Sequence, residues 1–193
     1  MDRGNRNREI EIKVRVQKPE RRVSFLRRNA REKGTLHQVD EYFVPAHRDF
    51  LDSEPVREWL RLRNEDGTCT INYKYFYYGR GGRSTQADEF ETQVKDAGQI
   101  QKIFRALGLK RIVKVDKVRD SWAYGDYEIG IDRVDGLGSF VEIEFRGRGG
   151  DSKRITDGMV GFLKKLDVGR IERNYQGYPF LILFPERVVF HRG

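Results

Sequence analysis

The sequence has little cysteine, proline or methionine and no long apolar run. Its 193 residues include one cysteine, Cys69, with five prolines and two methionines. A lone cysteine excludes an internal disulfide and a cysteine-based zinc site, and it is typical of a reducing compartment. No apolar run approaches the roughly 20 residues of a transmembrane helix, and the first residues do not resemble a signal peptide. We therefore expect a cytoplasmic protein that makes no membrane contact.

Charged residues, in contrast, are abundant. They make up 35% of the chain, against 37% hydrophobic residues, and 38 lysines and arginines face 30 acidic residues, for a formal net charge of +8. A basic balance favours anionic partners such as nucleotides, polyphosphates or nucleic acid. The length fits one domain over residues 1–193, and the polar N-terminal residues 1–7 are expected to be flexible.

Apolar and charged residues alternate in many segments, which is the pattern of a strand with one apolar face. The clearest example is REIEIKVRV at residues 8–16. Similar patterns predict strands near 36–44, 57–65, 68–77, 86–95, 111–119, 120–124, 127–134, 139–147 and 175–184. Helical spacing predicts helices over 20–33, between Asp96 and Gly108, and over 152–167. The sequence thus predicts an α+β, β-dominated and mostly antiparallel domain.

The charged strand faces are sorted by sign. Residues two apart on a strand share a face about 6.5–7 Å apart. The same-sign pairs are Arg61 with Arg63, Lys117 with Arg119, Glu89 with Glu91, and Glu142 with Glu144. In an open sheet such faces would be ordinary solvated surface, but sorted pairs suit a ligand. Carboxylates bind a hard divalent cation such as Mg²⁺ or Mn²⁺, and arginine and lysine bind phosphate oxygens. A metal-bound polyphosphate needs both, and a closed barrel would place both inside.

Several motifs occur in a recognisable order. They are EIEIK at 9–13, WLRLR at 59–63, NYK at 72–74, EFE at 89–91, KVR at 117–119, DRVDGLGSFVEIE at 132–144 and NYQGYPFLIL at 174–183. In this order they resemble the CYTH superfamily, the triphosphate tunnel metalloenzymes, and most closely its class IV adenylyl cyclase branch. The resemblance implies a closed eight-stranded antiparallel β-barrel with flanking helices. The barrel would form a tunnel for a triphosphate and a divalent cation, and a homodimer is a further possibility.

The resemblance also implies roles for individual residues. The metal ligands would be Glu9, Glu11, Glu142, Glu144 and Asp132. The phosphate-binding residues would be Lys13, Arg48, Arg61, Arg63, Lys74, Lys117 and Arg119. The acidic pair Glu89 and Glu91 would contribute to metal binding or to electrostatic balance. The residues expected to matter most for catalysis are Glu9, Glu11, Lys13 and Arg63.

Three functions are compatible with these residues. In a cyclase, the ribose 3′-hydroxyl of ATP attacks the α-phosphorus and pyrophosphate leaves, giving cyclic AMP. In a phosphohydrolase, water attacks the terminal phosphorus of tripolyphosphate, thiamine triphosphate or a nucleotide. A non-catalytic nucleotide- or RNA-binding barrel is the third alternative. RNA-binding proteins usually display exposed aromatic residues, whereas Tyr73, Tyr75, Phe90 and Phe145 are predicted on apolar strand faces, so an enzyme is favoured over nucleic-acid binding.

Overall fold

The computed structural model describes residues 10–79, 84–148, 150–169, 171–173, 176–188 and 191–192. The described residues divide into two compact units, one formed by Gln38–Val115 and the other by residues 10–37 together with those from Asp116 onward. Strands β2 (Arg31–Val44) and β6 (Lys110–Tyr124) each contribute to both units. The single domain expected from the length stays a prediction.

The first unit is an antiparallel meander covered on one face by a helix. Strands β3 (Glu58–Glu65), β4 (Thr68–Tyr78) and β5 (Ser84–Val94) follow β2 in order, after a short 3₁₀ turn, η1 (Phe50–Asp52). Helix α2 (Ala97–Ala106) begins after Asp96, whose side chain accepts a hydrogen bond from the Gln99 amide and so caps the helix. Phe104 of α2 packs against Phe43 and Leu62, which form the apolar core of this unit.

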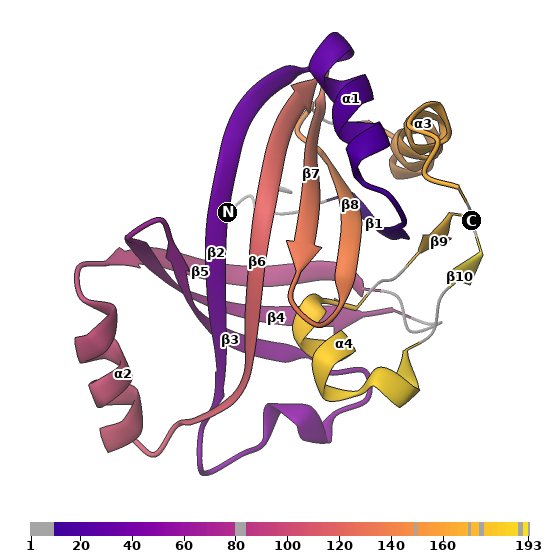
Figure 1. The fold of residues 1–193 in the computed structure, drawn as a ribbon. Helices are drawn as coiled ribbons and strands as arrows, with labels where there is room; N and C mark the ends of the chain where they lie inside the picture. The colour runs from indigo at the N-terminus through magenta and orange to yellow at the C-terminus, as the bar shows by residue number, and fades with distance from the viewer. Residues whose placement is uncertain are drawn as a thin grey trace. The chain divides into compact units, whose positions relative to one another are not determined.

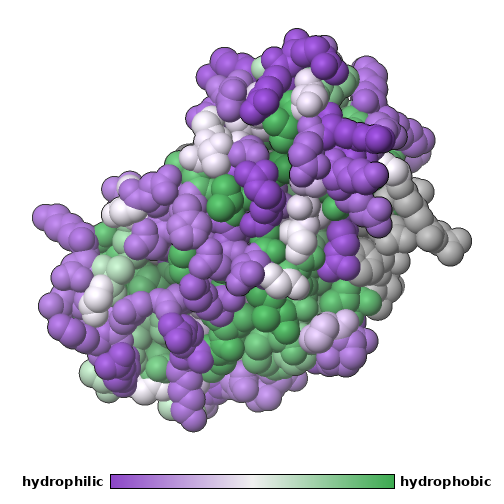
Figure 2. Space-filling view, viewed as in Figure 1, coloured by the Kyte–Doolittle hydropathy of each residue, from purple (hydrophilic) through white to green (hydrophobic). Residues whose placement is uncertain are grey.

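The second unit packs three helices around strands β1 (Glu11–Val16), β7 (Tyr127–Val134) and β8 (Gly138–Phe145) and the second half of β6. The helices are α1 (Glu20–Asn29), α3 (Ser152–Lys165) and α4 (Tyr178–Leu183), and the short elements are β9 (Glu172–Arg173), β10 (His191–Arg192) and the 3₁₀ turn η2 (Pro185–Arg187) (Figure 1). The apolar faces of β1, β7 and β8 form the core with α3, through residues such as Val14, Ile131 and Leu163. Hydrophilic residues cover much of α1 in the space-filling view (Figure 2), where Arg21, Arg27 and Arg28 are exposed.

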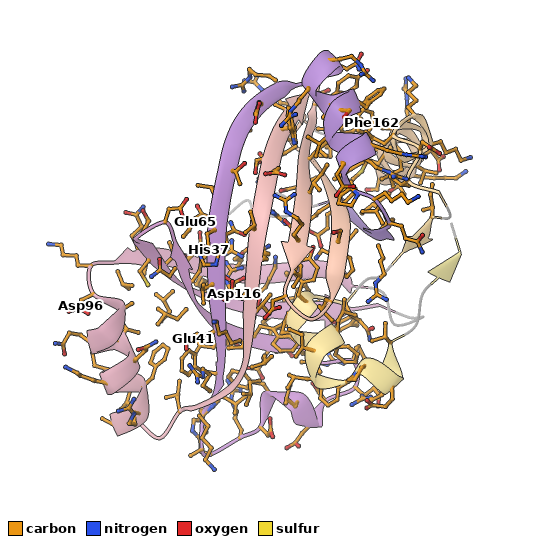
Figure 3. The ribbon with its side chains drawn as sticks, viewed as in Figure 1. His37, Glu41, Glu65, Asp96, Asp116 and Phe162 are labelled. Atoms are coloured by element: carbon orange, nitrogen blue, oxygen red, sulfur yellow. The ribbon has the colours of Figure 1, made fainter. Side chains whose placement is uncertain are left out.

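The strand order is β10-β9-β1-β8-β7-β6-β2-β3-β4-β5. In the second unit His37 of β2 and Asp116 of β6 face each other (Figure 3), with 2.7 Å between Nε2 and Oδ1. The structure therefore shows the predicted α+β fold, with an antiparallel sheet of eight main strands and flanking helices. No pairing among the described residues joins the two ends of this order, so the closed barrel is not shown. No helix in the described ranges is both long and apolar enough to cross a membrane.

Three element predictions were wrong. The segment predicted as a strand over 175–184 contains helix α4 from Tyr178 to Leu183. Its apolar run is continuous, and a short run of this kind has no period that separates a strand from a buried helix. The first helix ends at Asn29 rather than 33, and β2 begins at Arg31. The strands predicted at 111–119 and 120–124 are one strand, β6.

Candidate functional site

One face of the second unit gathers most of its charged strand residues. The register places Glu11 opposite Glu144 and Lys13 opposite Glu142. Across the next two strands, Glu144 faces Glu128 and Asp132 faces Arg119. Because side chains alternate along a strand, these residues share one face, and the apolar residues between them share the other. The prediction of a charged face opposite an apolar face is confirmed for β1, β7 and β8.

Asp132 and Glu142 pair with three cationic side chains at the centre of this face. Arg119 binds Asp132 through two parallel hydrogen bonds, from Nε to Oδ1 and from Nη2 to Oδ2, both 2.6 Å. Its Nη2 also donates to Glu142 Oε1 at 2.8 Å. Lys13 Nζ lies 3.0 Å from Glu142 Oε2, and Lys117 Nζ lies 3.4 Å from Asp132 Oδ2. We call the side chains of Lys13, Lys117, Arg119, Asp132 and Glu142 the central cluster.

The central cluster lies largely out of solvent. The Asp132 side chain is 0% exposed and that of Lys117 is 4% exposed, while Lys13 and Glu142 are 10% and 14% exposed. Buried charges are stable only when they are paired and hydrogen bonded. The two carboxylates provide ion pairs for all three cationic side chains, so each of them meets that condition.

The pKa values of the cluster favour its charged forms. Burial raises the pKa of the Glu142 carboxyl, but the charges of Lys13 and Arg119 outweigh burial and hold it well below its usual range. Burial likewise raises the pKa of Asp132, and the hydrogen bond from Arg119 with the charge of Lys117 lowers it further than burial raises it. Burial lowers the pKa of the Lys13 ammonium, while the Glu142 carboxylate and the nearby Glu11 raise it above the ordinary value. All of these groups are therefore ionised at neutral pH.

Tyr178 completes the centre of this face, although no local pattern in the sequence singles it out. Its hydroxyl donates to Asp132 Oδ2 at 2.6 Å. The amino groups of Lys13 and Lys117 lie 4.4 and 5.0 Å from the centroid of its ring. Tyr178 belongs to α4, 46 positions from Asp132, so no local pattern places the two together. Its position within NYQGYPFLIL was the only signal in the sequence.

A row of carboxylates lies beside the central cluster. Glu11, Glu144 and Glu128 are directly opposite one another on β1, β8 and β7. Arg146 pairs with Glu144 at 2.8 Å, and Lys33 pairs with Glu128 at 2.8 Å. Carboxylates in directly opposite positions repel each other, and a divalent cation that accepts oxygen ligands would remove this repulsion.

The predicted metal ligands are thus divided between two environments. Glu11 and Glu144 lie opposite each other and offer oxygen ligands of the type that Mg²⁺ or Mn²⁺ takes, and Glu144 also pairs with Arg146. Glu142 and Asp132 bind the cationic side chains of the central cluster. In the parts of the chain that the structure describes, no three histidine, cysteine, aspartate or glutamate side chains are grouped closely enough to form a metal site. Glu9 lies outside the described residues.

The first unit carries its own charged face. Arg63 binds Asp40 through Nε and Nη2 at 2.6 and 2.8 Å. The other ion pairs are Arg61 with Glu91 at 3.2 Å and Lys74 with Glu89 at 3.3 Å. Asn72 donates to both Glu89 and Glu91. The structure therefore brings together the predicted cations Arg61, Arg63 and Lys74 and the predicted acids Glu89 and Glu91 on one face.

Arg48 stands apart from that group. It is exposed in the loop before η1 and pairs with Glu58 at 2.8 Å. Glu58 lies on the opposite face of β3 from Arg61 and Arg63, since strand positions of opposite parity face opposite ways. Glu58 also accepts a hydrogen bond from the Tyr73 hydroxyl, and burial together with this bond raises the pKa of Tyr73 to about 12. Phe90, predicted on the apolar face of its strand, stacks on Tyr73 but is 66% exposed, so it is not a core residue.

Solved structures from Pyrococcus horikoshii and Hippeastrum have the same fold. A Pyrococcus horikoshii protein, PH1819, matches with a TM-score of 0.75 and 24% identity, covering 92% of this chain and 99% of its own. A "putative adenylyl cyclase" from Hippeastrum, whose structure is described as revealing a dominant triphosphatase activity, matches with a TM-score of 0.63 and 18% identity, covering 94% and 98%. At these identities the likeness establishes the fold.

Sequence comparison gives the family. A curated protein of Methanocaldococcus jannaschii, named "putative adenylate cyclase", is 30% identical over 164 residues, which cover 84% of this chain and 91% of that protein. The family model for the CYTH domain matches residues 7–168. That range contains every strand of the central cluster and of the charged face in the first unit. The chain therefore belongs to the CYTH domain family.

Proposed function

We propose that this protein is a metal-dependent triphosphate-processing enzyme of the class IV adenylyl cyclase type, converting ATP to cyclic AMP and pyrophosphate. The observation that carries the proposal is the central cluster, in which Lys13, Lys117 and Arg119 are gathered on one strand face with fewer carboxylates than cations. Such a cluster suits a multiply charged anion better than a neutral ligand. The name of the Methanocaldococcus jannaschii relative supports the cyclase reaction in particular.

The side chains of the central cluster would bind phosphate oxygens. Arg119 offers parallel donors, which match two oxygens of one phosphate group, and the two lysines offer point charges. Phosphate oxygens would replace part of the contact that these cations make with Asp132 and Glu142. Arg61, Arg63 and Lys74 of the first unit, and the exposed Arg48, are proposed as further phosphate ligands. The closed eight-stranded barrel predicted from the sequence is also part of this proposal.

Glu11 and Glu144, with Glu9, would hold a divalent cation, Mg²⁺ or Mn²⁺. When bound, such a cation neutralises phosphate charge and polarises the phosphoryl oxygens. Glu142 and Asp132 would keep the side chains of Lys13, Lys117 and Arg119 oriented for the substrate, because each carboxylate already accepts from two or more of these donors. Catalysis would then come mainly from positioning and charge stabilisation.

A phosphohydrolase is the second candidate. The observation that favours it is the Hippeastrum neighbour, which is named as an adenylyl cyclase and described as having a dominant triphosphatase activity. The same cations would hold the triphosphate, and only the attacking oxygen and the phosphorus it reaches would differ. Tripolyphosphate, thiamine triphosphate and nucleoside triphosphates are the substrates to compare.

Phosphorus-31 NMR can separate these reactions. The purified protein would be incubated with Mg²⁺ or Mn²⁺ and, separately, with ATP, tripolyphosphate and thiamine triphosphate. Cyclic AMP with pyrophosphate from ATP is the result we expect. Orthophosphate without a cyclic product would establish the phosphohydrolase instead, and no product from any of the three substrates would contradict both enzymes.

Two glutamate variants and a matched control make the metal assignment testable. Glu11→Gln and Glu144→Gln keep side-chain shape but remove the carboxylate charge, and we expect each to lower turnover at least tenfold and to raise the metal concentration needed for half-maximal rate. Glu41→Gln is the control, because Glu41 is also a strand glutamate but binds Arg111 and Gln101 in the first unit. Normal metal dependence in both Glu11→Gln and Glu144→Gln would contradict the assignment.

A further inference from the structure

We propose that Tyr178 of helix α4 is a positioning residue that fixes Lys13, Lys117 and Arg119 as one binding unit for a polyphosphate chain. The inference rests on the proposed function and deepens it, because it names what holds the phosphate-binding cations in place. Tyr178 lies beyond residue 168, where the match to the CYTH domain model ends. The role is therefore assigned from the contacts of this chain.

The ring of Tyr178 contacts two lysines from strands that are not neighbours. Lys13 is on β1 and Lys117 is on β6, and β8 and β7 lie between these strands in the sheet order. With strands about 4.8 Å apart, the two backbones are separated by about 14 Å. Both amino groups nevertheless lie over the same ring, at 4.4 and 5.0 Å from its centroid. Each distance is within the range of a cation–π interaction.

The hydroxyl of Tyr178 reaches the third cation through a carboxylate. It donates to Asp132 Oδ2 at 2.6 Å, and the same oxygen accepts from Arg119 Nη2 at 2.6 Å and lies 3.4 Å from Lys117 Nζ. Three donors therefore meet at this one oxygen, and together they hold Asp132 in one orientation.

The ring itself is held rigidly. Tyr178 is 5% exposed, and Phe140 of β8 packs edge-on against it with 5.0 Å between ring centroids. Helix α4 starts at Tyr178 itself, with Pro179 fixing the backbone of the first turn. Proline in the first turn is compatible with a helix and restricts its backbone. Tyr178 can therefore act as a fixed surface for the two flexible lysine side chains.

An aromatic ring suits this place better than another carboxylate would. Within the central cluster three cationic side chains face two carboxylates, and Glu11 acts on Lys13 from the neighbouring row. A further carboxylate in the place of the ring would compete with the phosphates for the lysines. The face of a ring attracts both lysines without adding a further negative charge beside them.

Calorimetric titration with tripolyphosphate in the presence of Mg²⁺ tests the role of Tyr178. Tyr178→Phe keeps the ring and removes the hydroxyl, and we expect affinity to fall about threefold to tenfold. Tyr178→Leu removes both, and we expect a loss of about thirtyfold or more. Tyr127→Phe is the matched control, since Tyr127 is a half-buried tyrosine of the same unit that packs against Phe145 and Phe162 in the apolar core. The Tyr127→Phe variant should bind tripolyphosphate with the affinity of the wild type.

A double-mutant cycle separates positioning from a general structural effect. If Tyr178 acts through Lys117, then Tyr178→Leu should weaken tripolyphosphate binding much less in a Lys117→Met background than in the wild type. Equal losses in both backgrounds would overturn the inference. Should Tyr178→Leu fail to fold, the cycle is made with Tyr178→Phe, whose change is smaller but follows the same rule.

The failure of this inference can be distinguished from that of the proposed function. If the wild type binds tripolyphosphate and both Tyr178 variants bind it equally well, only the role of Tyr178 is refuted. If the wild type does not bind tripolyphosphate at all, the proposed function is refuted and this role with it.

Discussion

The substitution Asp132→Asn probes the buried pairing on which the site depends. Asp132 is 0% exposed and accepts from Arg119 twice, from Tyr178 and from Lys117. Asparagine keeps the shape but removes the charge, and its NH₂ group can only donate. The NH₂ group of the new amide would therefore face hydrogen-bond donors, and Lys117 and Arg119 would lose their shared counter-charge.

The expected loss of stability follows from that geometry. Removing one partner of a buried ion pair destabilises a protein by about 3–5 kcal/mol. With a urea dependence of about 2 kcal/mol per molar, the unfolding midpoint should fall by about 1.5–2.5 M. The assay is urea unfolding at neutral pH, followed by circular dichroism.

Asp120→Asn is the matched control for this measurement. Asp120 is also a β6 aspartate paired with an arginine of β7, Arg133, at 2.9 Å, but the Arg133 side chain is 45% exposed. An exposed pair of this kind contributes about 0–1 kcal/mol. If Asp132→Asn costs no more stability than Asp120→Asn, the buried cluster does not carry the charges assigned to it.

Further predictions concern pH and two glycines. The pKa of Glu142 is lower in the folded protein than in the unfolded chain, so ionised Glu142 stabilises the fold. This contribution is fully present above the unfolded pKa of about 4.3 and is lost as pH falls through the folded pKa. In Glu142→Gln the loss of stability between about pH 5 and 2 should therefore be less steep, and an unchanged slope would argue against the ionised pair. At Gly130 an added Cβ would lie 3.0 Å from Arg119 Nε, so Gly130→Ala should displace the Arg119 side chain. Calorimetry should then show that tripolyphosphate binds about tenfold more weakly. Unchanged binding would show that Arg119 is not needed in this position. At Gly161, within helix α3, an added Cβ meets nothing within 4 Å. Gly161→Ala should therefore raise the free energy of unfolding by about 0.5–1 kcal/mol. A lower free energy of unfolding, measured with urea, would contradict this.

The strands and their charged faces could be predicted from the sequence because both follow from a local period. Alternation in 8–16 placed Glu11 and Lys13 on one face, and the structure confirms this for β1. The apolar face of α3 was predictable for the same reason, since Met159, Phe162 and Leu163 repeat at helical spacing and are buried. Each of these features depends on residues within one element.

The partners of individual charges could not be predicted, because they depend on register between distant strands. The alternation placed Glu142 and Lys13 on charged strand faces, but it did not show that the two residues pair or that Glu142 also binds Arg119. The role of Glu142 as a metal ligand stays a prediction. Tyr178 was missed for a related reason: its segment was predicted as a strand, and only the packing of α4 brings its ring to Lys13 and Lys117.

The most direct test of the central claim is the affinity of the wild-type protein for tripolyphosphate, pyrophosphate and orthophosphate, measured by calorimetry in one Mg²⁺ buffer. If the cations of the central cluster form a site for a polyphosphate chain, each added phosphate gains at least one charge-assisted contact. Because such contacts contribute about 1.5–3 kcal/mol, affinity should rise about tenfold or more per phosphate. Equal affinity for the three anions, or no binding of any of them, would contradict the account.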